Sequence, residues 1–143
     1  MGRAPVTKMV IPSKLSETQR VTEPLFQQIA DHDYPEKAVF AIRLSVDEAL
    51  TNAIRHGNCN DPEKQVAVEW AVTDKQVRIT VTDEGCGFHP DHLPDPTESE
   101  NLTRPCGRGV MLMQAYMTDV KFNKRGNQVT MIKDRDCVGP SAD

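Results

Sequence analysis

The 143-residue chain has no basic tract, no apolar run long enough to cross a bilayer and no signal-peptide core at its start. The first absence argues against nucleic acid as a direct partner, because such a surface needs clustered lysine and arginine, and the formal net charge here is -4. The other two absences argue against membrane insertion and secretion. A cytoplasmic location is therefore the default expectation.

The cysteine spacing excludes two kinds of small-protein scaffold. Four cysteines are scattered along the chain without a C-x-x-C motif. A zinc knuckle or a disulfide framework would need a regular pattern, so we expect free thiols. His89 and His92 lie in a proline-rich stretch without a third and fourth ligand nearby, which favours solvated loop residues over a metal site.

The length and composition indicate one globular domain over residues 1–143, with its core at about 6–133. A chain of this length can build one substantial hydrophobic core. Hydrophobic residues make up 38% and charged residues 27%, which is ordinary for a soluble globular protein. We find no internal repeat and no domain linker.

Alternating apolar residues predict a largely antiparallel sheet. The clearest alternation lies in two neighbouring stretches joined by a tight turn at Asp74-Lys75. Strands that cluster in hairpins pair antiparallel. The expected strands cover residues 6–12, 66–71, 77–82, 118–124 and 128–133, and we expect a loose tail at 134–143.

Apolar residues at three- and four-residue steps predict three helices, at 16–33, 35–56 and 109–117. Pro24 interrupts the first, which either begins near Pro24 or is kinked there. The third is apolar on nearly all sides and should be buried. This order of elements predicts an α+β fold, a two-layer α/β sandwich with a mostly antiparallel sheet and helices on one face.

Three polar clusters stand out against this framework. Glu48 and Asn52 lie one turn apart on a helix face away from the apolar stripe. The second cluster, Asp83-Glu84-Gly85-Cys86-Gly87, follows a strand, and the third, Gly107-Arg108-Gly109, precedes a helix. Taken alone, the Glu48/Asn52 pair is more typical of a solvated helix face, and a lone G-x-G is usually a turn.

Together, the three clusters indicate an adenine nucleotide site. A carboxylate at the end of a strand is a pure acceptor, so it can receive an exocyclic amine. A carboxamide oxygen can bind Mg²⁺, which keeps several waters and bridges phosphates. Glycines before a helix let backbone N–H groups approach a phosphate, and the helix dipole favours the anion.

These motifs resemble those of the GHKL ATPases, and the small anti-sigma factor serine kinases in particular. Glu48-x-x-x-Asn52, with Ala53 and His56-Gly57 after it, is similar to the N box. Asp83-x-Gly85-x-Gly87 is similar to the first glycine box and Gly107-x-Gly109 to the second. The resemblance spans about residues 6–133 and implies a Bergerat-type ATP-binding fold that uses ATP and Mg²⁺.

The resemblance also implies a role for each matching residue. Glu48 would be the general base and Asn52 would hold Mg²⁺ against the phosphates. Asp83 would take the adenine amino group, with Gly85 and Gly87 forming that wall. The phosphates would lie against Gly107, Arg108, Gly109 and Val110. The lid would cover residues 88–106, and Arg104 within it could reach the γ-phosphate.

Two features depart from the family pattern. The family often has Gly-Thr in the last hairpin, where this chain has Gly126-Asn127, so the usual hydroxyl near adenine is either missing or supplied by Thr130. The lid is acidic and rich in proline, which is not standard.

The resemblance implies an ATP-dependent protein serine kinase that phosphorylates an antagonist protein and sequesters a sigma factor. The alternative is a non-catalytic ATP-binding module that controls a partner by nucleotide-dependent binding. The presence of Glu48 favours the kinase, since binding alone needs no base. A histidine-kinase fragment is disfavoured, because no helix pair with a phosphorylatable histidine precedes the domain. A homodimer is an open alternative.

Overall fold

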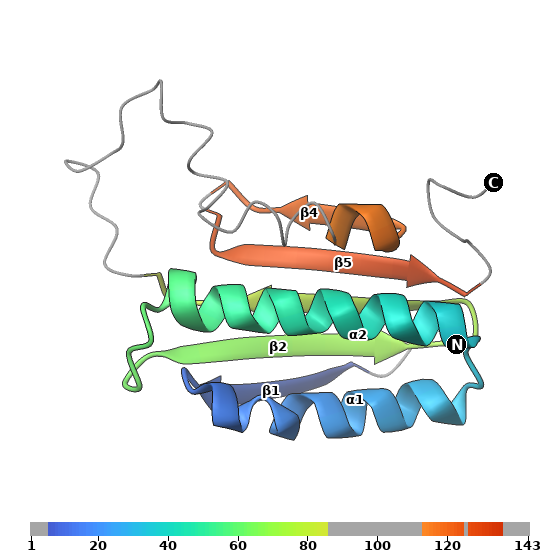
Figure 1. Cartoon of the computed structure of the whole chain (residues 1–143), viewed down its shortest axis with the longest axis horizontal. Helices are drawn as coiled ribbons and strands as arrows, with labels where there is room; N and C mark the ends of the chain where they lie inside the picture. Colours follow the sequence, from blue (N-terminus) through green and yellow to red (C-terminus); the bar gives the residue numbers. More distant parts are fainter. Residues whose placement is uncertain (1–5, 86–112, 125, 136–143) are drawn as a thin grey trace.

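The computed structural model describes residues 6–85, 113–124 and 126–135. It consists of a five-stranded sheet with helices packed on one face (Figure 1). The sheet order is β1-β2-β3-β5-β4, and each neighbouring pair is antiparallel. The strands are β1 Thr7–Pro12, β2 Gln65–Val72, β3 Gln76–Thr82, β4 Asp119–Phe122 and β5 Gln128–Asp134. The predicted α+β class and the antiparallel sheet are confirmed.

The two faces of the sheet differ because successive side chains of a strand point to opposite sides. The face under the helices is apolar. Its buried hydrophobic side chains in the three central strands are Val66, Val68, Trp70, Val72, Val77, Ile79, Val81, Val129 and Met131. The opposite face, called the open face here, carries Thr80, Thr82 and Thr130 among its partly exposed residues.

Helix α1, Gln19–Asp31, follows a short 3-10 turn at Leu15–Glu17, and α2 covers Glu36–Thr51. Pro24 lies inside α1, so the alternative in which the helix begins at Pro24 is wrong. Its missing N–H falls beyond the first turn, where packing outweighs the local penalty: Val21, Leu25 and Ile29 are all fully buried. None of the helices among the described residues is long and apolar enough to cross a membrane.

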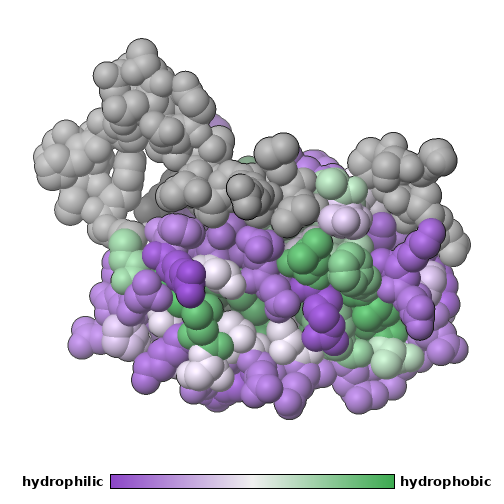
Figure 2. Space-filling model, in the orientation of Figure 1, coloured by the Kyte–Doolittle hydropathy of each residue, from purple (hydrophilic) through white to green (hydrophobic). Residues whose placement is uncertain are grey.

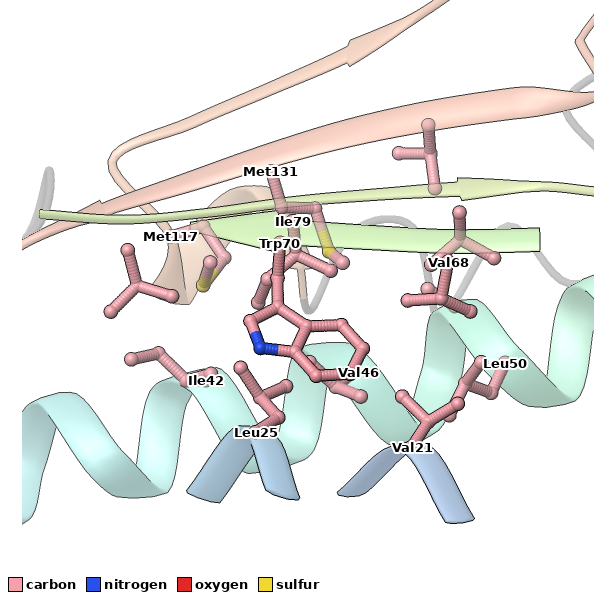
Figure 3. Close-up of a cluster of buried hydrophobic side chains, with 14 of the residues drawn as sticks. Val21, Leu25, Ile42, Val46, Leu50, Val68, Trp70, Ile79, Met117 and Met131 are labelled. Carbon is pink, nitrogen blue, oxygen red and sulfur yellow. The ribbon is translucent and has the colours of Figure 1, made fainter. Parts of the chain in front are cut away.

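Trp70 lies at the centre of the core between the two layers (Figure 3). It extends from β2 among side chains of both helices, such as Leu25 and Val46, and of the neighbouring strand, such as Ile79. Burying each of the valine, leucine and isoleucine side chains around Trp70 contributes about 1.5–3 kcal/mol relative to leaving it exposed. This packing fixes α2 on the sheet, and with it the residues at the end of α2.

Three expectations need correction. Residues 113–116 are helical, and Met113 is buried, but Ala115 and Tyr116 are exposed, so this part of the helix has one buried side only. The tail is not loose at its start. Asp134 ends β5, and Arg135 donates hydrogen bonds to the carbonyl oxygens of residues 32 and 33 at 2.7 and 2.8 Å.

Cys59 is the third correction: it is disulfide-bonded, not a free thiol. It lies two residues beyond the helical segment that ends at Gly57 and has a left-handed backbone with φ of 54°. Sequence spacing could not indicate this, because the fold and not the spacing decides which cysteines meet. The other three cysteines lie outside the described residues.

Candidate functional site

The end of α2 brings the first two predicted residues together. The Asn52 N–H bonds to the carbonyl oxygen of Glu48, which closes one α-helical turn between them, as predicted. Both side chains are partly exposed. Beyond them the helix changes: Asn52–Gly57 is a π-helix, and the Asn58 N–H reaches the Ala53 carbonyl oxygen at 2.8 Å. The expected α-helix to residue 56 therefore ends in one wider turn, a feature that is frequent at functional sites.

Gly57 packs directly against the carboxylate of Asp83. A Cβ atom added to Gly57 would lie 2.2 Å from both Cγ and Oδ2 of Asp83, far inside van der Waals contact. The sequence indicated Gly57 only as part of the motif that resembles the N box. The residues with left-handed backbone after the helix are Cys59 and Asn60. Glycine is needed at position 57 because a side chain there would overlap the Asp83 carboxylate. This contact joins the predicted N box to the first glycine box.

The Asp83 carboxylate is also held by its own loop. The Gly85 N–H donates to Asp83 Oδ1 at 2.9 Å, and Gly85 has a φ of 82° that favours glycine. Asp83 is partly exposed at the end of β3. An ionised carboxylate has about four lone-pair positions, so a bond to Gly85 is compatible with receiving an amine from a ligand.

Asn58 is a buried polar residue beneath this site, and sequence reasoning missed it. Its side chain has an exposed fraction of 0%. The carboxamide nitrogen donates to Ser13 Oγ at 2.7 Å and to the Gln65 carbonyl oxygen at 2.9 Å. The oxygen accepts the backbone N–H groups of Glu84 at 2.8 Å and Gly85 at 3.2 Å. One side chain thus ties α2, β1, β2 and the Asp83 loop together.

Replacing Asn58 with alanine should therefore destabilise the fold by about 2–4 kcal/mol, because it leaves several buried polar groups without partners. Urea unfolding measures this loss. The matched control is Gln27→Ala, which removes an exposed side-chain bond to Asp31 Oδ1 and should stay within about 0.5 kcal/mol of wild type. Equal losses in the two variants would contradict the role assigned to Asn58.

The last hairpin contacts Asp83 through Asn127, the position that departs from the family pattern. The Asp83 N–H donates to the Asn127 carbonyl oxygen at 2.8 Å, and Asn127 Nδ2 donates to the Asp83 carbonyl oxygen at 2.8 Å. Thr130 is not part of this cluster. Its hydroxyl lies 3.2 Å from Thr80 Oγ1 on the open face of the sheet, because odd-numbered β5 residues face the helices.

Two carboxylates near or outside the site have shifted pKa values. Burial raises the pKa of Asp47, next to Glu48 in α2, and the charge of Arg43 opposes that rise. At the other end of β3, a hydrogen bond from His32 holds the pKa of Asp74 below its ordinary value. Asp74 therefore belongs to the structural contacts between α1 and the β2–β3 turn, not to the site.

The described part of the site fits the base end of an adenine nucleotide. Asp83 supplies an acceptor, and Gly57 leaves the space that the carboxylate fills. Among the described residues, no group of three or more His, Cys, Asp or Glu could hold a metal ion. Asn52 offers one neutral oxygen, so a Mg²⁺ ion there would take its other ligands from phosphates and water. The other predicted residues, Gly87, Arg104, Gly107, Arg108, Gly109 and Val110, and the lid at 88–106, lie outside the described residues.

Comparison with known proteins agrees with this geometry. The family model of the histidine kinase-like ATPase domain matches residues 11–133. An anti-sigma F factor of Geobacillus stearothermophilus is 33% identical over 120 residues, covering 79% of this chain and 77% of that protein. Another, of Shouchella clausii, is 35% identical over 115 residues, covering 76% and 77%. The chain therefore belongs to the histidine kinase-like ATPase domain family.

Proposed function

We propose that this protein is an ATP-dependent serine kinase that phosphorylates a small antagonist protein and also sequesters a sigma factor. The observation that carries the proposal is the contact between Gly57 and the Asp83 carboxylate. It brings the Asp83 carboxylate, which we assign to the nucleotide base, close to the end of the helix that carries Glu48, and this supports the proposal. Relatives with the name anti-sigma F factor, similar over three quarters of their length, support the partner class.

Three residues of the candidate site have a role in this reaction. Asp83 accepts a hydrogen bond from the amino group of adenine, which fixes the base. Asn52 would hold Mg²⁺ through its carboxamide oxygen, and the bound ion would supply positive charge against the phosphates. Glu48 accepts the proton of the partner's serine hydroxyl. The serine oxygen then forms the new bond to the γ-phosphorus, and the bond to the bridging oxygen breaks, which releases ADP.

The surface beside Glu48 offers a protein partner an apolar contact. Phe40, Leu44 and Glu48 follow one another at four-residue steps and share one face of α2. The Phe40 side chain is 58% exposed and meets the Tyr116 ring edge to face at 5.9 Å between centroids. The helix-bearing side is otherwise mainly hydrophilic, with separate apolar areas (Figure 2). We take the contact pair Phe40 and Tyr116 as the candidate apolar contact for the partner.

The proposal is tested by label transfer from γ-labelled ATP to a candidate antagonist protein with Mg²⁺ present. We expect label on a serine of the partner and none when Mg²⁺ is removed by chelation. A wild-type protein that binds both ATP and the antagonist but never transfers label would overturn the kinase assignment. The protein would then be a nucleotide-dependent binding module.

A further inference from the structure

We infer that Asn127 is a positioning residue that holds Asp83 where its carboxylate recognises the amino group of adenine. This inference rests on the proposed function. It concerns the position at which the family often has threonine, and it assigns the carboxamide of Asn127 to the protein's own backbone instead of to the base.

The role follows from how the β3–β5 ladder ends. A hydrogen-bonded antiparallel pair normally exchanges two backbone N–H···O bonds. The ladder pairs Thr82 with Gln128, and the next two residues are Asp83 and Asn127. Asp83 donates its N–H to the Asn127 carbonyl oxygen at 2.8 Å, as expected. The return bond comes from the side chain: Asn127 Nδ2 donates to the Asp83 carbonyl oxygen at 2.8 Å.

Asn123 holds the Asn127 carboxamide in this orientation. The backbone N–H of Asn127 bonds to Asn123 Oδ1 at 3.1 Å, so it is turned away from Asp83. Asn123 Nδ2 donates to Asn127 Oδ1 at 2.8 Å, which directs the donor end of that carboxamide toward Asp83. Both polar groups of the Asp83 main chain, N–H and C=O, are therefore fixed by Asn127.

The two hydrogen bonds from Asn127 to the Asp83 main chain matter because the carboxylate has little freedom of its own. It lies against Gly57 on one side and accepts the Gly85 N–H at 2.9 Å on the other. A shift of the Asp83 main chain would move the carboxylate out of line with an amino group, since hydrogen bonds weaken steeply with angle. Losing the Asn127 donor should therefore affect base recognition more than phosphate binding.

The test compares the affinities for ATP and for inosine triphosphate, which has a carbonyl oxygen in place of the 6-amino group. Wild type should prefer ATP. Asn127→Ala should weaken ATP binding by about three- to tenfold, the range of one lost hydrogen bond, and leave the affinity for inosine triphosphate unchanged. A purely structural role would lower both affinities together. The ratio of the ATP affinity to the inosine triphosphate affinity therefore separates a positioning role from a structural one.

Two further variants keep the test decisive. Asn123→Ala leaves Asn127 in place but removes its orienting partner, and it should lower the same ratio even where Asn127→Ala folds poorly. Gln128→Ala is the matched control: it removes a bond of 3.0 Å to Thr82 Oγ1 in the same hairpin, on the open face, and should leave the ratio at the wild-type value.

The outcomes distinguish the inference from the function on which it rests. If wild type prefers ATP but the Asn127 and Asn123 variants keep the wild-type ratio, the positioning role is wrong and the proposed function stands. If the ratio falls equally in Gln128→Ala, general weakening of the hairpin explains it and the inference also fails. If wild type binds both nucleotides equally, the adenine role of Asp83 fails, and the inference fails with it.

Discussion

Glu48→Gln is expected to lower phosphoryl transfer by about a hundred- to ten-thousand-fold, the usual contribution of a general base. The substitution keeps the shape of the side chain and removes its basic carboxylate. ATP binding should stay near the wild-type level, because we assign the contact with adenine to Asp83 and not to Glu48. Label transfer to the antagonist and calorimetric ATP binding, measured on the same preparations, give the two quantities.

Asp47→Asn is the matched control for this variant. Asp47 is the adjacent carboxylate of α2 but lies about 100° around the helix from Glu48. Burial raises its pKa, yet it has no place in the proposed reaction. The Asp47→Asn variant should transfer label at nearly the wild-type rate. Transfer at the wild-type rate by Glu48→Gln, or an equal loss in both variants, would show that the base lies elsewhere.

Asp83→Asn should weaken ATP binding by about ten- to hundredfold. The carboxylate accepts only, whereas a carboxamide is part donor, and hydrogen bonds to a charged group contribute about 1.5–3 kcal/mol. Isothermal titration calorimetry with Mg²⁺ present measures the loss. Equal ATP affinity in wild type and Asp83→Asn would remove the adenine assignment.

Gly57→Ala tests the same contact without changing any charge. The added methyl group would overlap the Asp83 carboxylate, so the carboxylate has to move, and ATP affinity should fall. The overlap with a carboxylate that has little freedom outweighs the helix preference of alanine over glycine, so stability should fall by about 1–3 kcal/mol. If the Gly57→Ala variant binds ATP normally, the carboxylate can move without losing its contact with adenine.

The sequence predicts those parts of the fold that local patterns determine. Alternation at residues 66–71 and 77–82 predicted the central hairpin, whose strands in the structure are Gln65–Val72 and Gln76–Thr82. The spacing of Glu48 and Asn52 predicted one helical turn between them, and in the structure the Asn52 N–H bonds to the Glu48 carbonyl oxygen. These features depend on periodicity within one element, which a single sequence displays directly.

Features that depend on contacts between distant residues could not be predicted. Asn58 bonds to Ser13, 45 positions away, and nothing near either residue indicates the pairing. Gly57 fits a helix stop equally well until the Asp83 carboxylate is seen against it. Asn127 differs from the family pattern, but only the structure shows that its side chain bonds to the Asp83 main chain instead of lying free for the base.

In the proposed complex the nucleotide base lies at the end of α2, beside Asp83. The most plausible rival place is a cavity of about 250 Å³ on the other side of the sheet, whose lining includes Lys8, Ala67 and Thr80. The two places lie on opposite faces of the same sheet. A binding measurement alone does not separate them, because either would give a single saturable site.

Titration of the ¹⁵N-labelled protein with ATP and Mg²⁺, followed by amide chemical shifts, separates them directly. The largest changes among the described residues should fall on Asn52–Gly57 at the end of α2 and on residues 83–85 after β3. The amides of Lys8 and Ala67 should change little. Changes centred on Lys8 and Ala67, with residues 83–85 unmoved, would contradict the account.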